Sequence, residues 1–381
     1  MTGPATGTTA LACVALGSSA TELRTLDVTG CGADDGWLRV EASGICGTDV
    51  ALAAKDLDAP VILGHHVVGQ VEDLGPQAAQ RWGVTAGDRV ALEEYLPCGS
   101  CPACRAGRYR ECPDTDLWGG GRRVGLVPVD ESPSLWGGNA QYMYLPPNAV
   151  VHRLPPDLPA SLAAWTLPLA NAVDWVSRVG AAAPGETVVV IGPGYHGLAA
   201  VAAARHAGAA QVLVGGLPRD ASRLRLAEKL GATTFDTSQP DVAEHVRALT
   251  DGRGADLVVD IAGAGPETVS TAMSLLGARG RLVVAGIKNP ALASIDTAAL
   301  VRGMHTVSGV RGRDPESVAR SIDVLAGGGA GLGDAPSEDV PLAEVGQMLA
   351  RLAAGDGPET PHVVVRPWLS PTDANADRSA S

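Results

Sequence analysis

Aromatic residues and positive charge are both scarce in this chain. Phe, Trp and Tyr make up 3% of its 381 residues, so we expect a core built mainly from Ala, Val and Leu. Lys and Arg together number 29 against 42 Asp and Glu, which gives a formal net charge of −13 at pH 7. A chain this acidic repels phosphate backbones, so the composition argues against a nucleic-acid partner.

Long hydrophobic runs are also missing. No uninterrupted apolar stretch reaches the roughly 20 residues that a membrane span requires. The apolar stretch at residues 8–20 has no basic residue before it, because the first is Arg24, so it indicates a strand rather than a secretory signal. We therefore predict a cytoplasmic protein that has no membrane partner.

The cysteines favour metal binding over disulfides. There are seven, an odd number, and four of them fall in the pattern Cys98-x2-Cys101-x2-Cys104-x7-Cys112. Four thiolates can surround Zn²⁺ tetrahedrally, and two-residue spacers let one tight loop present several sulfurs to one ion. Four sulfur ligands leave no open position for a substrate, so we predict a structural zinc. A redox cluster and a nucleic-acid-binding zinc ribbon are the alternatives, and the acidity of the chain argues against the ribbon.

The length and the pattern of apolar residues indicate two kinds of domain. At roughly 100–200 residues per domain, the chain has room for two or three. The first 150 residues or so contain Val-rich segments bounded by Gly, among them Trp37–Ile45, Val67–Gly75 and Asp88–Glu93, which predict a small β-barrel. From about Pro155 onward strands alternate with helices, so we predict an α/β fold with a parallel, doubly wound sheet.

A glycine-rich turn interrupts this alternating region. Gly192, Gly194 and Gly197 form G-x-G-x-x-G, which follows the apolar strand expected at residues 187–191 and opens an Ala-rich helix. Such glycines permit a tight turn, a close approach of the backbone to a pyrophosphate, and close packing of helix on strand. The helix N-terminus then faces the phosphates. We therefore predict a nicotinamide dinucleotide, NAD(P)(H), bound by Gly192, Gly194, Tyr195, His196 and Gly197.

The next strand bears on the choice between NAD(H) and NADP(H). It ends at Gly216, and no acidic residue stands at its tip to bind a ribose 2′-hydroxyl. Arg219 could bind a 2′-phosphate instead, whereas Asp220 could reach back to the ribose. We favour NADP(H) slightly, with Gly216 and Arg219 as cofactor contacts.

Three further motifs complete a family pattern. They are Gly-Ile-Cys-Gly-Thr-Asp at residues 44–49, Gly64-His65, and Gly-Gly-Asn-Ala-Gln-Tyr at residues 137–142. Together with the cysteine cluster and the glycine-rich turn, in this order and spacing, they make the chain resemble the zinc-dependent medium-chain alcohol dehydrogenases. The similarity extends over about residues 10–367.

The resemblance implies an architecture and a reaction. The expected fold is a GroES-like β-barrel catalytic domain, residues 1–157 and 306–381, interrupted by a Rossmann NAD(P)-binding domain at 158–305, with the active site in the cleft between them. Members of the family are usually homodimers or homotetramers. They transfer hydride between nicotinamide and an alcohol carbon of a small molecule, whose oxygen binds a catalytic zinc.

The resemblance also assigns roles to residues near the first motif. Cys46 and His65 match two zinc ligands, Thr48 matches the hydroxyl that passes the substrate proton, and Asp49 matches the residue that supports the ligands. Three positions depart from the pattern: His66 stands where Glu is usual, Leu167 where the third ligand is usual, and Ala51 where many members have a proton-relaying His. Two ligands alone are too few for tight zinc binding.

His66 gives two ways to account for this departure. It could act as the third ligand, but neighbouring strand residues point to opposite faces, so this arrangement needs a bend at Gly64. Alternatively, the catalytic zinc is weak or absent. The family also places a small apolar residue beside the nicotinamide where this chain has His196, so His196 either donates a proton in place of the missing relay or packs against the cofactor.

We therefore predict a zinc-containing, NAD(P)(H)-dependent oxidoreductase that acts on a secondary alcohol and its ketone, or on a related carbonyl. The changed ligand set leaves two alternatives. One is a reductase of an activated C=C or C=N bond with an atypical or absent catalytic zinc. The other is a non-catalytic protein that binds the cofactor.

Overall fold

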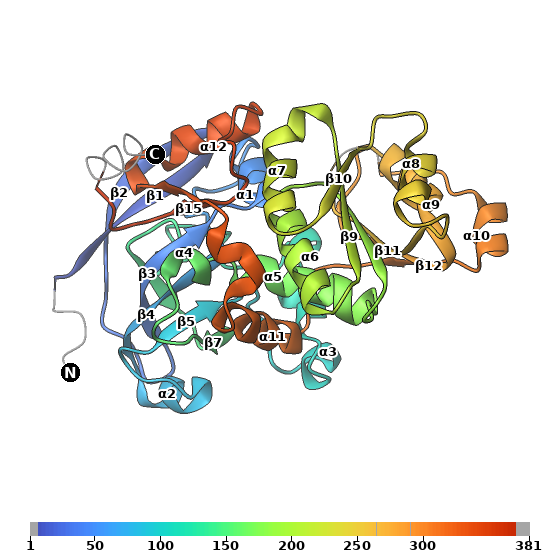
Figure 1. The fold of residues 1–381 in the computed structure, drawn as a ribbon. Helices are drawn as coiled ribbons and strands as arrows, with labels where there is room; N and C mark the ends of the chain where they lie inside the picture. Colours follow the sequence, from blue (N-terminus) through green and yellow to red (C-terminus); the bar gives the residue numbers. More distant parts are fainter. Residues whose placement is uncertain (1–6, 264, 290, 371–381) are drawn as a thin grey trace. The chain divides into compact units, whose positions relative to one another are not determined.

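The computed structural model describes residues 7–263, 265–289 and 291–370, and the sequence prediction for the polar tail after Ser370 lies outside these ranges. The chain divides into two compact units (Figure 1). The first unit comprises Met1–Leu167, Ser337–Pro358 and His362–Ser381, and the second comprises Pro168–Pro336 and Glu359–Pro361.

The first unit is built mainly from antiparallel strands. Seven strands form one sheet in the order β14-β15-β3-β4-β5-β7, with β6 paired to β3, and β1 pairs with β2 in a separate hairpin. The strands are β1 (Thr9–Gly17), β2 (Ala20–Asp27), β3 (Gly36–Gly44), β4 (His66–Leu74), β5 (Arg89–Leu92), β6 (Tyr142–Leu145), β7 (Val151–Arg153), β14 (Glu338–Val340) and β15 (Val363–Val365). The Val-rich segments expected to be strands are β3, β4 and β5.

Short helices connect these strands. They are α1 (Gly47–Ala53), α2 (Pro76–Trp82), α3 (Pro102–Arg105), η1 (Tyr109–Glu111), η2 (Pro113–Thr115), η3 (Leu117–Gly119), α4 (Ala160–Ala163), η7 (Leu342–Glu344) and α12 (Val345–Ala353). The buried side chains are mostly Ala, Val and Leu, as the composition predicts. Trp37 and Trp165 are the largest fully buried side chains among the described residues of this unit.

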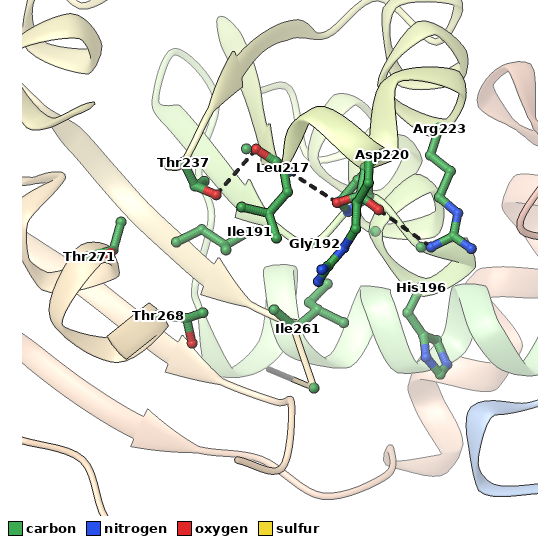
Figure 2. Close-up of a pocket in the computed structure, with 18 of the residues that line it drawn as sticks. Ile191, Gly192, His196, Leu217, Asp220, Arg223, Thr237, Ile261, Thr268 and Thr271 are labelled. Carbon is green, nitrogen blue, oxygen red and sulfur yellow. Dashed lines mark hydrogen bonds and ion pairs between the residues drawn. The ribbon is translucent and has the colours of Figure 1, made fainter. Parts of the chain in front are cut away.

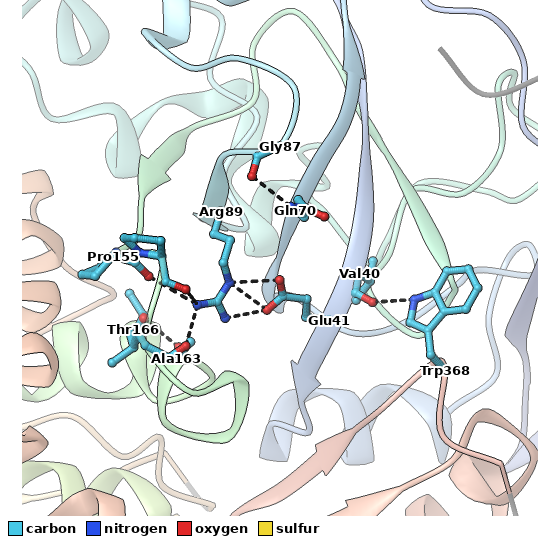
Figure 3. A network of polar contacts seen from close by, with 11 residues as sticks. Val40, Glu41, Gln70, Gly87, Arg89, Pro155, Ala163, Thr166 and Trp368 are labelled. Carbon is cyan, nitrogen blue, oxygen red and sulfur yellow. Dashed lines mark hydrogen bonds and ion pairs between the residues drawn. The ribbon is translucent and has the colours of Figure 1, made fainter. Parts of the chain in front are cut away.

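Arg89 joins the sheet to the segment that follows it. Its guanidinium donates to the Glu41 carboxylate, with Nη2 2.6 Å from Oε2, so it links β5 to β3. Its Nη1 also donates to the carbonyls of Pro156 and Leu158, at 2.9 and 2.5 Å. Figure 3 shows Arg89 between Glu41 and Pro155. A guanidinium satisfies several acceptors at once, so one side chain fixes the end of this loop against the sheet.

The second unit contains a six-stranded parallel sheet in the order β10-β9-β8-β11-β12-β13. This is the doubly wound order of a Rossmann fold, in which the first strand, here β8, lies beside both the second and the fourth. The strands are β8 (Thr187–Ile191), β9 (Gln211–Gly216), β10 (Thr233–Asp236), β11 (Ala255–Asp260), β12 (Leu276–Val284) and β13 (Thr306–Gly309). The predicted fold class is confirmed.

Helices alternate with these strands. They are α5 (Thr166–Val173), η4 (Asp174–Val179), α6 (Tyr195–His206), η5 (Pro218–Asp220), α7 (Ala221–Lys229), α8 (Val242–Leu249), α9 (Glu267–Ser274), α10 (Thr297–Gly303), α11 (Pro315–Ala326) and η6 (Gly329–Asp334). Pro168 lies in the first turn of α5, where a helix tolerates proline. Among the described residues, no helix is both long enough and apolar enough to cross a membrane.

The Ala-rich helix α6 is the centre of this unit. All residues from Gly197 to Ala204 are buried, as expected of a helix that is apolar on every side. Gly192 adopts φ +103°, a conformation that favours glycine. A Cβ atom on Gly197 would lie 2.1 Å from the Gly192 carbonyl oxygen, so only glycine lets the helix start this close to the turn. The N-terminus of α6 is thereby fixed at the carboxyl end of β8.

Candidate active site and metal centres

The four predicted zinc ligands come together in the first unit. The sulfur atoms of Cys98, Cys101, Cys104 and Cys112 all lie within 4.8 Å of one another, and those of Cys98 and Cys104 are 4.0 Å apart. Zn–S bonds of about 2.3 Å in a tetrahedron separate the sulfurs by about 3.8 Å. The cluster therefore fits a zinc ion with little rearrangement.

The electrostatics of this cluster also favour a bound cation. The backbone N–H and hydroxyl of Ser100 and the backbone N–H of Cys101 donate to the Cys98 sulfur, and they lower the pKa of this thiol to about 6. Burial and the neighbouring sulfurs raise the pKa of Cys104 to about 12. The four sulfurs therefore cannot all ionise at neutral pH unless a cation compensates their charge, as zinc would.

A buried carboxylate holds the segment that carries these cysteines. Glu93, just after β5, accepts hydrogen bonds from the Tyr109 hydroxyl and from Nε2 of His152, the latter at 2.8 Å. Tyr109 belongs to the cysteine segment and His152 to β7. Glu93 thus ties this segment to the sheet. No spacing in the sequence points to Glu93, because its partners are 16 and 59 residues away.

Cys46, His65 and His66 form a second group, whose ligand atoms all lie within 4.8 Å of one another. Cys46 is the N-cap of α1, His65 immediately precedes β4, and His66 begins it. Gly64 has φ +94°, so the chain bends just before the two histidines. Their ring centroids are 4.6 Å apart, which brings both imidazoles to one place despite their adjacency in sequence.

Asp49 hydrogen-bonds to residues of this second group. Its buried carboxylate accepts from the backbone N–H of Cys46 at 2.8 Å and of Gly64 at 3.2 Å, and it lies 3.0 Å from Nδ1 of His65. A histidine whose Nδ1–H donates to a carboxylate has its Nε2 free to bind a metal. Burial lowers the pKa of His65, but the charges of Asp49 and Cys46 outweigh it and raise the pKa well above its usual range. The pocket favours a positive charge, and a metal ion would supply it.

Thr48, Leu167 and Ala51 are the other positions that the sequence analysis named for this group. Thr48 lies in the first turn of α1, half-buried, and its N–H is 3.5 Å from the Cys46 sulfur. Leu167 is 1% exposed and has no atom that can bind zinc. Ala51 lies exposed on α1 and carries no titratable group. The donor set in this part of the chain is thus one thiol and two imidazoles, a combination that suits zinc and leaves one of four positions open.

The glycine-rich turn lines a cavity of about 610 Å³ in the second unit. The turn, the ends of β9 and β10, and the loop after β11 form its walls (Figure 2). A dinucleotide binds at the carboxyl ends of such strands, so the cavity has the position and the size for one. The structure brings together in it every residue predicted to contact the cofactor, namely Gly192, Gly194, Tyr195, His196, Gly197, Gly216 and Arg219.

Asp220 is engaged in the turn after β9. Its carboxylate accepts from the backbone N–H of Leu217 at 3.0 Å and lies 3.6 Å from Nη1 of Arg223 (Figure 2). A side chain at position 216 would meet the Pro193 ring, 3.0 Å from a Cβ atom there. The tip of β9 therefore presents backbone to the cavity, with Arg219 and Arg223 beside it.

A buried ion pair behind the same cavity was not foreseen from the sequence. Lys288 Nζ lies 2.8 Å from the Asp260 carboxylate and donates to the Ala262 carbonyl at 2.5 Å. Asp260 also accepts from the Thr268 hydroxyl at 2.8 Å. Ala262 and Thr268 line the cavity, so the pair fixes one wall. Lys288 is one of only three lysines in an arginine-rich chain, which is the one signal that could have drawn attention to it.

Comparison with known proteins places these features in a family. Residues 32–156 match the alcohol dehydrogenase GroES-like domain, and residues 197–327 match the zinc-binding dehydrogenase domain. An alcohol dehydrogenase of Mycobacterium tuberculosis is 38% identical over 88% of this chain and 92% of its own length. A solved structure of a zinc-binding dehydrogenase from Sinorhizobium meliloti bound to NADP has 28% identity and a TM-score of 0.80, covering 94% of this chain and 100% of that one.

The fold, the cofactor cavity and the two groups of candidate metal ligands together define a zinc-binding dehydrogenase. The chain belongs to the zinc-dependent medium-chain alcohol dehydrogenase family, with a GroES-like domain and a Rossmann-like parallel sheet. Zinc and NAD(P) are its cofactors, and its activity is that of an NAD(P)-dependent alcohol oxidoreductase. The sequence predictions of family, fold, cofactors and class of activity are confirmed.

Proposed function

We propose that the protein is an NADP(H)-dependent dehydrogenase of a secondary alcohol, with a catalytic metal held by Cys46, His65 and His66. The proximity of these three ligand atoms, within 4.8 Å and held by Asp49, carries the proposal. Bound there, zinc would bind the alcohol oxygen and lower its pKa. Thr48, beside Cys46 in α1, would accept the alcohol proton. Because position 51 is Ala, that proton leaves by water or by another side chain.

Named relatives support a secondary alcohol as the substrate. An erythritol/L-threitol dehydrogenase of Mycolicibacterium smegmatis is 37% identical over 66% of this chain and 68% of its own length. An L-threonine 3-dehydrogenase of Streptomyces coelicolor is 34% identical over 79% of this chain and 83% of its own. The hydroxyl at carbon 3 of threonine is secondary. We therefore propose a small hydroxylated substrate of this type.

His66→Leu tests the proposed metal centre. We expect about two zinc ions per wild-type chain and one in the variant, measured by mass spectrometry, together with loss of alcohol oxidation. His245→Leu, on helix α8 in the second unit, is the matched control and should retain both ions. One zinc per wild-type chain, with reduction of an activated C=C or C=N bond, would favour the alternative reductase.

The preference for NADP(H) rests on the tip of β9. Gly216 carries no side chain and a Cβ atom there would lie 3.0 Å from the Pro193 ring, Asp220 is already hydrogen-bonded, and Arg219 and Arg223 flank the cavity. Two guanidinium groups suit a 2′-phosphate. Arg219→Ala should raise KM for NADPH about tenfold and leave KM for NADH unchanged, because only NADPH carries the phosphate. Equal changes for both cofactors would contradict the proposed preference.

We further propose that the protein assembles as a homodimer or homotetramer in the cytoplasm. Strand β13 is one edge of the parallel sheet, and its Val307 is exposed, as are Val301 on α10 and Met304 just after that helix. Unpaired strand edges with apolar side chains favour association. Val307→Arg should reduce the mass measured by light scattering to that of one chain. None of the seven cysteines, all of which lie in the described part of the chain, forms a disulfide, and this is compatible with a reducing compartment.

A further inference from the structure

A chain of hydrogen bonds in the second unit leads from a buried arginine to the cofactor cavity. Arg313 is 1% exposed, and its Nη1 donates to Oδ1 of Asn171 at 3.0 Å. Nδ2 of Asn171 lies 3.1 Å from Nε2 of His196. His196 lines the cavity that the glycine-rich turn forms. The sequence singled out His196 but gave no sign of Asn171, 25 residues before it, or of Arg313, which lies 142 residues beyond Asn171.

The loop that carries Arg313 is held at several points. The Asp174 carboxylate accepts from the backbone N–H of Asp314 at 3.0 Å and from the Ser317 hydroxyl at 3.2 Å. Nε1 of Trp175 donates to the Gly312 carbonyl at 3.0 Å. Asp174 and Trp175 open η4, a π-helical segment that directly follows the helix carrying Asn171. Such segments are rare and are frequently found at functional sites, so this geometry points to a role beyond packing.

The chemistry of the three side chains fixes the direction of each hydrogen bond. A guanidinium can only donate, so the atom of Asn171 that faces Arg313 is the carbonyl oxygen. The amide NH₂ therefore faces His196, and it too can only donate. Nε2 of His196 must then accept, which leaves the ring proton of the neutral imidazole on Nδ1. Protonation of Nε2 would set two donors against each other.

Two aromatic rings hold the imidazole in place. The ring centroids of Tyr195 and Trp175 lie 4.2 and 5.1 Å from that of His196. The orientation and the tautomer of this residue are therefore both set before any ligand binds. A fixed N–H donor of this kind suits a carbonyl or hydroxyl oxygen, both of which the nicotinamide half of a dinucleotide carries.

We propose that Arg313 and Asn171 are positioning residues that hold His196 neutral and protonated at Nδ1, so that Nδ1–H donates to an oxygen of bound NADP(H). The recognition part of this inference rests on the proposed cofactor. The tautomer of His196, in contrast, is a property of the protein without bound cofactor. In this arrangement His196 recognises the cofactor by a hydrogen bond and does not pass a proton through Nε2.

Nitrogen-15 NMR of histidine-labelled protein without cofactor tests the tautomer. The chain has eight histidines, and the spectrum of His196→Gln identifies the signals of His196 by their loss. In the wild type we expect a protonated Nδ1 and an unprotonated Nε2. Asn171→Asp should invert this pattern, because a carboxylate can only accept and would draw the proton to Nε2. A wild-type His196 protonated at Nε2, or no change in Asn171→Asp, would overturn the proposal.

Two further variants make the test robust. Arg313→Met frees the Asn171 amide to rotate, so the signals of His196 should become those of a mixture of tautomers. This variant decides the question if Asn171→Asp does not fold, as judged by circular dichroism. Asn148→Asp is the matched control, because it makes the same change on an exposed loop of the first unit, and it should leave the His196 signals as they are.

Measurements of cofactor affinity test whether His196 recognises NADP(H) by this hydrogen bond. Fluorescence titration should show that Asn171→Asp binds NADPH about tenfold more weakly than the wild type, because its Nδ1 no longer carries the proton that donates. An inverted tautomer with unchanged affinity would overturn the role in recognition. A wild type that binds no NADPH would overturn the proposed cofactor and the recognition with it, while the NMR experiment would still decide the tautomer.

Discussion

The cluster of four cysteines comes from one short segment, Cys98–Cys112, whereas the second group combines Cys46 with two histidines that follow α1 by more than ten residues. In the first cluster every candidate metal ligand is a sulfur, and backbone N–H groups of neighbouring residues donate hydrogen bonds to the sulfurs. In the second group the candidate ligands are a thiol and two imidazoles. The carboxylate of Asp49, which is not one of them, hydrogen-bonds to the backbone of Cys46 and to the ring of His65. Four ligands close a tetrahedral site, and three leave a position open.

This difference distinguishes the proposed structural zinc site from the proposed catalytic one. A closed site can be built from local turns, because its only task is to hold an ion and the loop around it. A site with an open position must keep its ligands in place even while a substrate exchanges there. It therefore depends on a supporting residue such as Asp49, and on a backbone bend that only one residue type adopts easily.

Removal of one sulfur should have the largest effect. In Cys101→Ser we expect the zinc content to fall by one ion per chain and the free energy of unfolding to fall by more than about 5 kcal/mol, since structural zinc contributes about 10–16 kcal/mol in small zinc-binding peptides. Metal analysis and thermal unfolding measure both effects. Cys31→Ser, outside both clusters, should keep the full zinc content. Retained zinc in Cys101→Ser would contradict a four-sulfur site.

Gly64→Ala should damage the second group and leave the first intact. Position 64 has φ +94°, and a Cβ atom there would lie 2.6 Å from both Oδ1 of Asn139 and Oγ of Ser43. Strain and overlap together should cost about 3 kcal/mol, and the loss of one zinc per chain should follow. Gly83→Ala is a matched control, because φ is +64° and nothing lies within 4 Å of a Cβ atom there.

If Gly83→Ala and Gly64→Ala lowered the free energy of unfolding equally, the contacts around Gly64 would have no part in the effect. If Gly64→Ala lost its zinc from the cysteine cluster instead, the two sites would not be independent. Cobalt substitution distinguishes the sites, since an all-sulfur site and a mixed one give different absorption spectra.

Asp49→Asn should weaken the second group without removing a ligand. The amide keeps the size of the carboxylate but loses the charge that faces His65. Loss of such supporting partners typically reduces metal affinity or activity by 10–100-fold. Zinc retention against a chelator and kcat measure the effect, and Asp56→Asn, an exposed position just beyond α1, is the control. Unchanged retention would mean that the three ligands hold the metal without Asp49.

The same contrast explains what the sequence could predict. The spacing of Cys98, Cys101, Cys104 and Cys112 predicts a zinc site, and the spacing of G-x-G-x-x-G predicts a dinucleotide site. Both can be predicted because the residues of each motif are close together along the chain. The strand β8 is evident as an apolar run, and α6 as an Ala-rich helix. The short edge strands β10 and β13 were not predicted, because their sequences, Thr-Thr-Phe-Asp and Thr-Val-Ser-Gly, are only four residues long and carry no apolar run.

Supporting residues escaped prediction for a related reason. Asp49 came only from the family resemblance, and Glu93, Lys288 and Arg313 came from the structure alone. Each acts through partners far away in sequence, so its role depends on tertiary contacts that no local pattern encodes. The bend at Gly64 lies between these cases: the sequence indicated that a bend would be needed if His66 were a ligand, and the φ of +94° at Gly64 shows that the chain bends there.

The smallest effect should come from Glu93→Gln, which weakens the support of the four-cysteine cluster from outside. Glutamine keeps one acceptor oxygen for Tyr109 and His152 but loses the charge that strengthens both hydrogen bonds. We expect the free energy of unfolding to fall by about 1–2 kcal/mol, measured by denaturant titration, with zinc content unchanged. Glu111→Gln, on the exposed surface of the same segment, should change it by less than about 0.5 kcal/mol. Loss of zinc in Glu93→Gln would show that the four-cysteine cluster needs a supporting carboxylate to keep its metal, as we expect of the group of Cys46, His65 and His66. The two sites would then not differ in their need for a supporting residue.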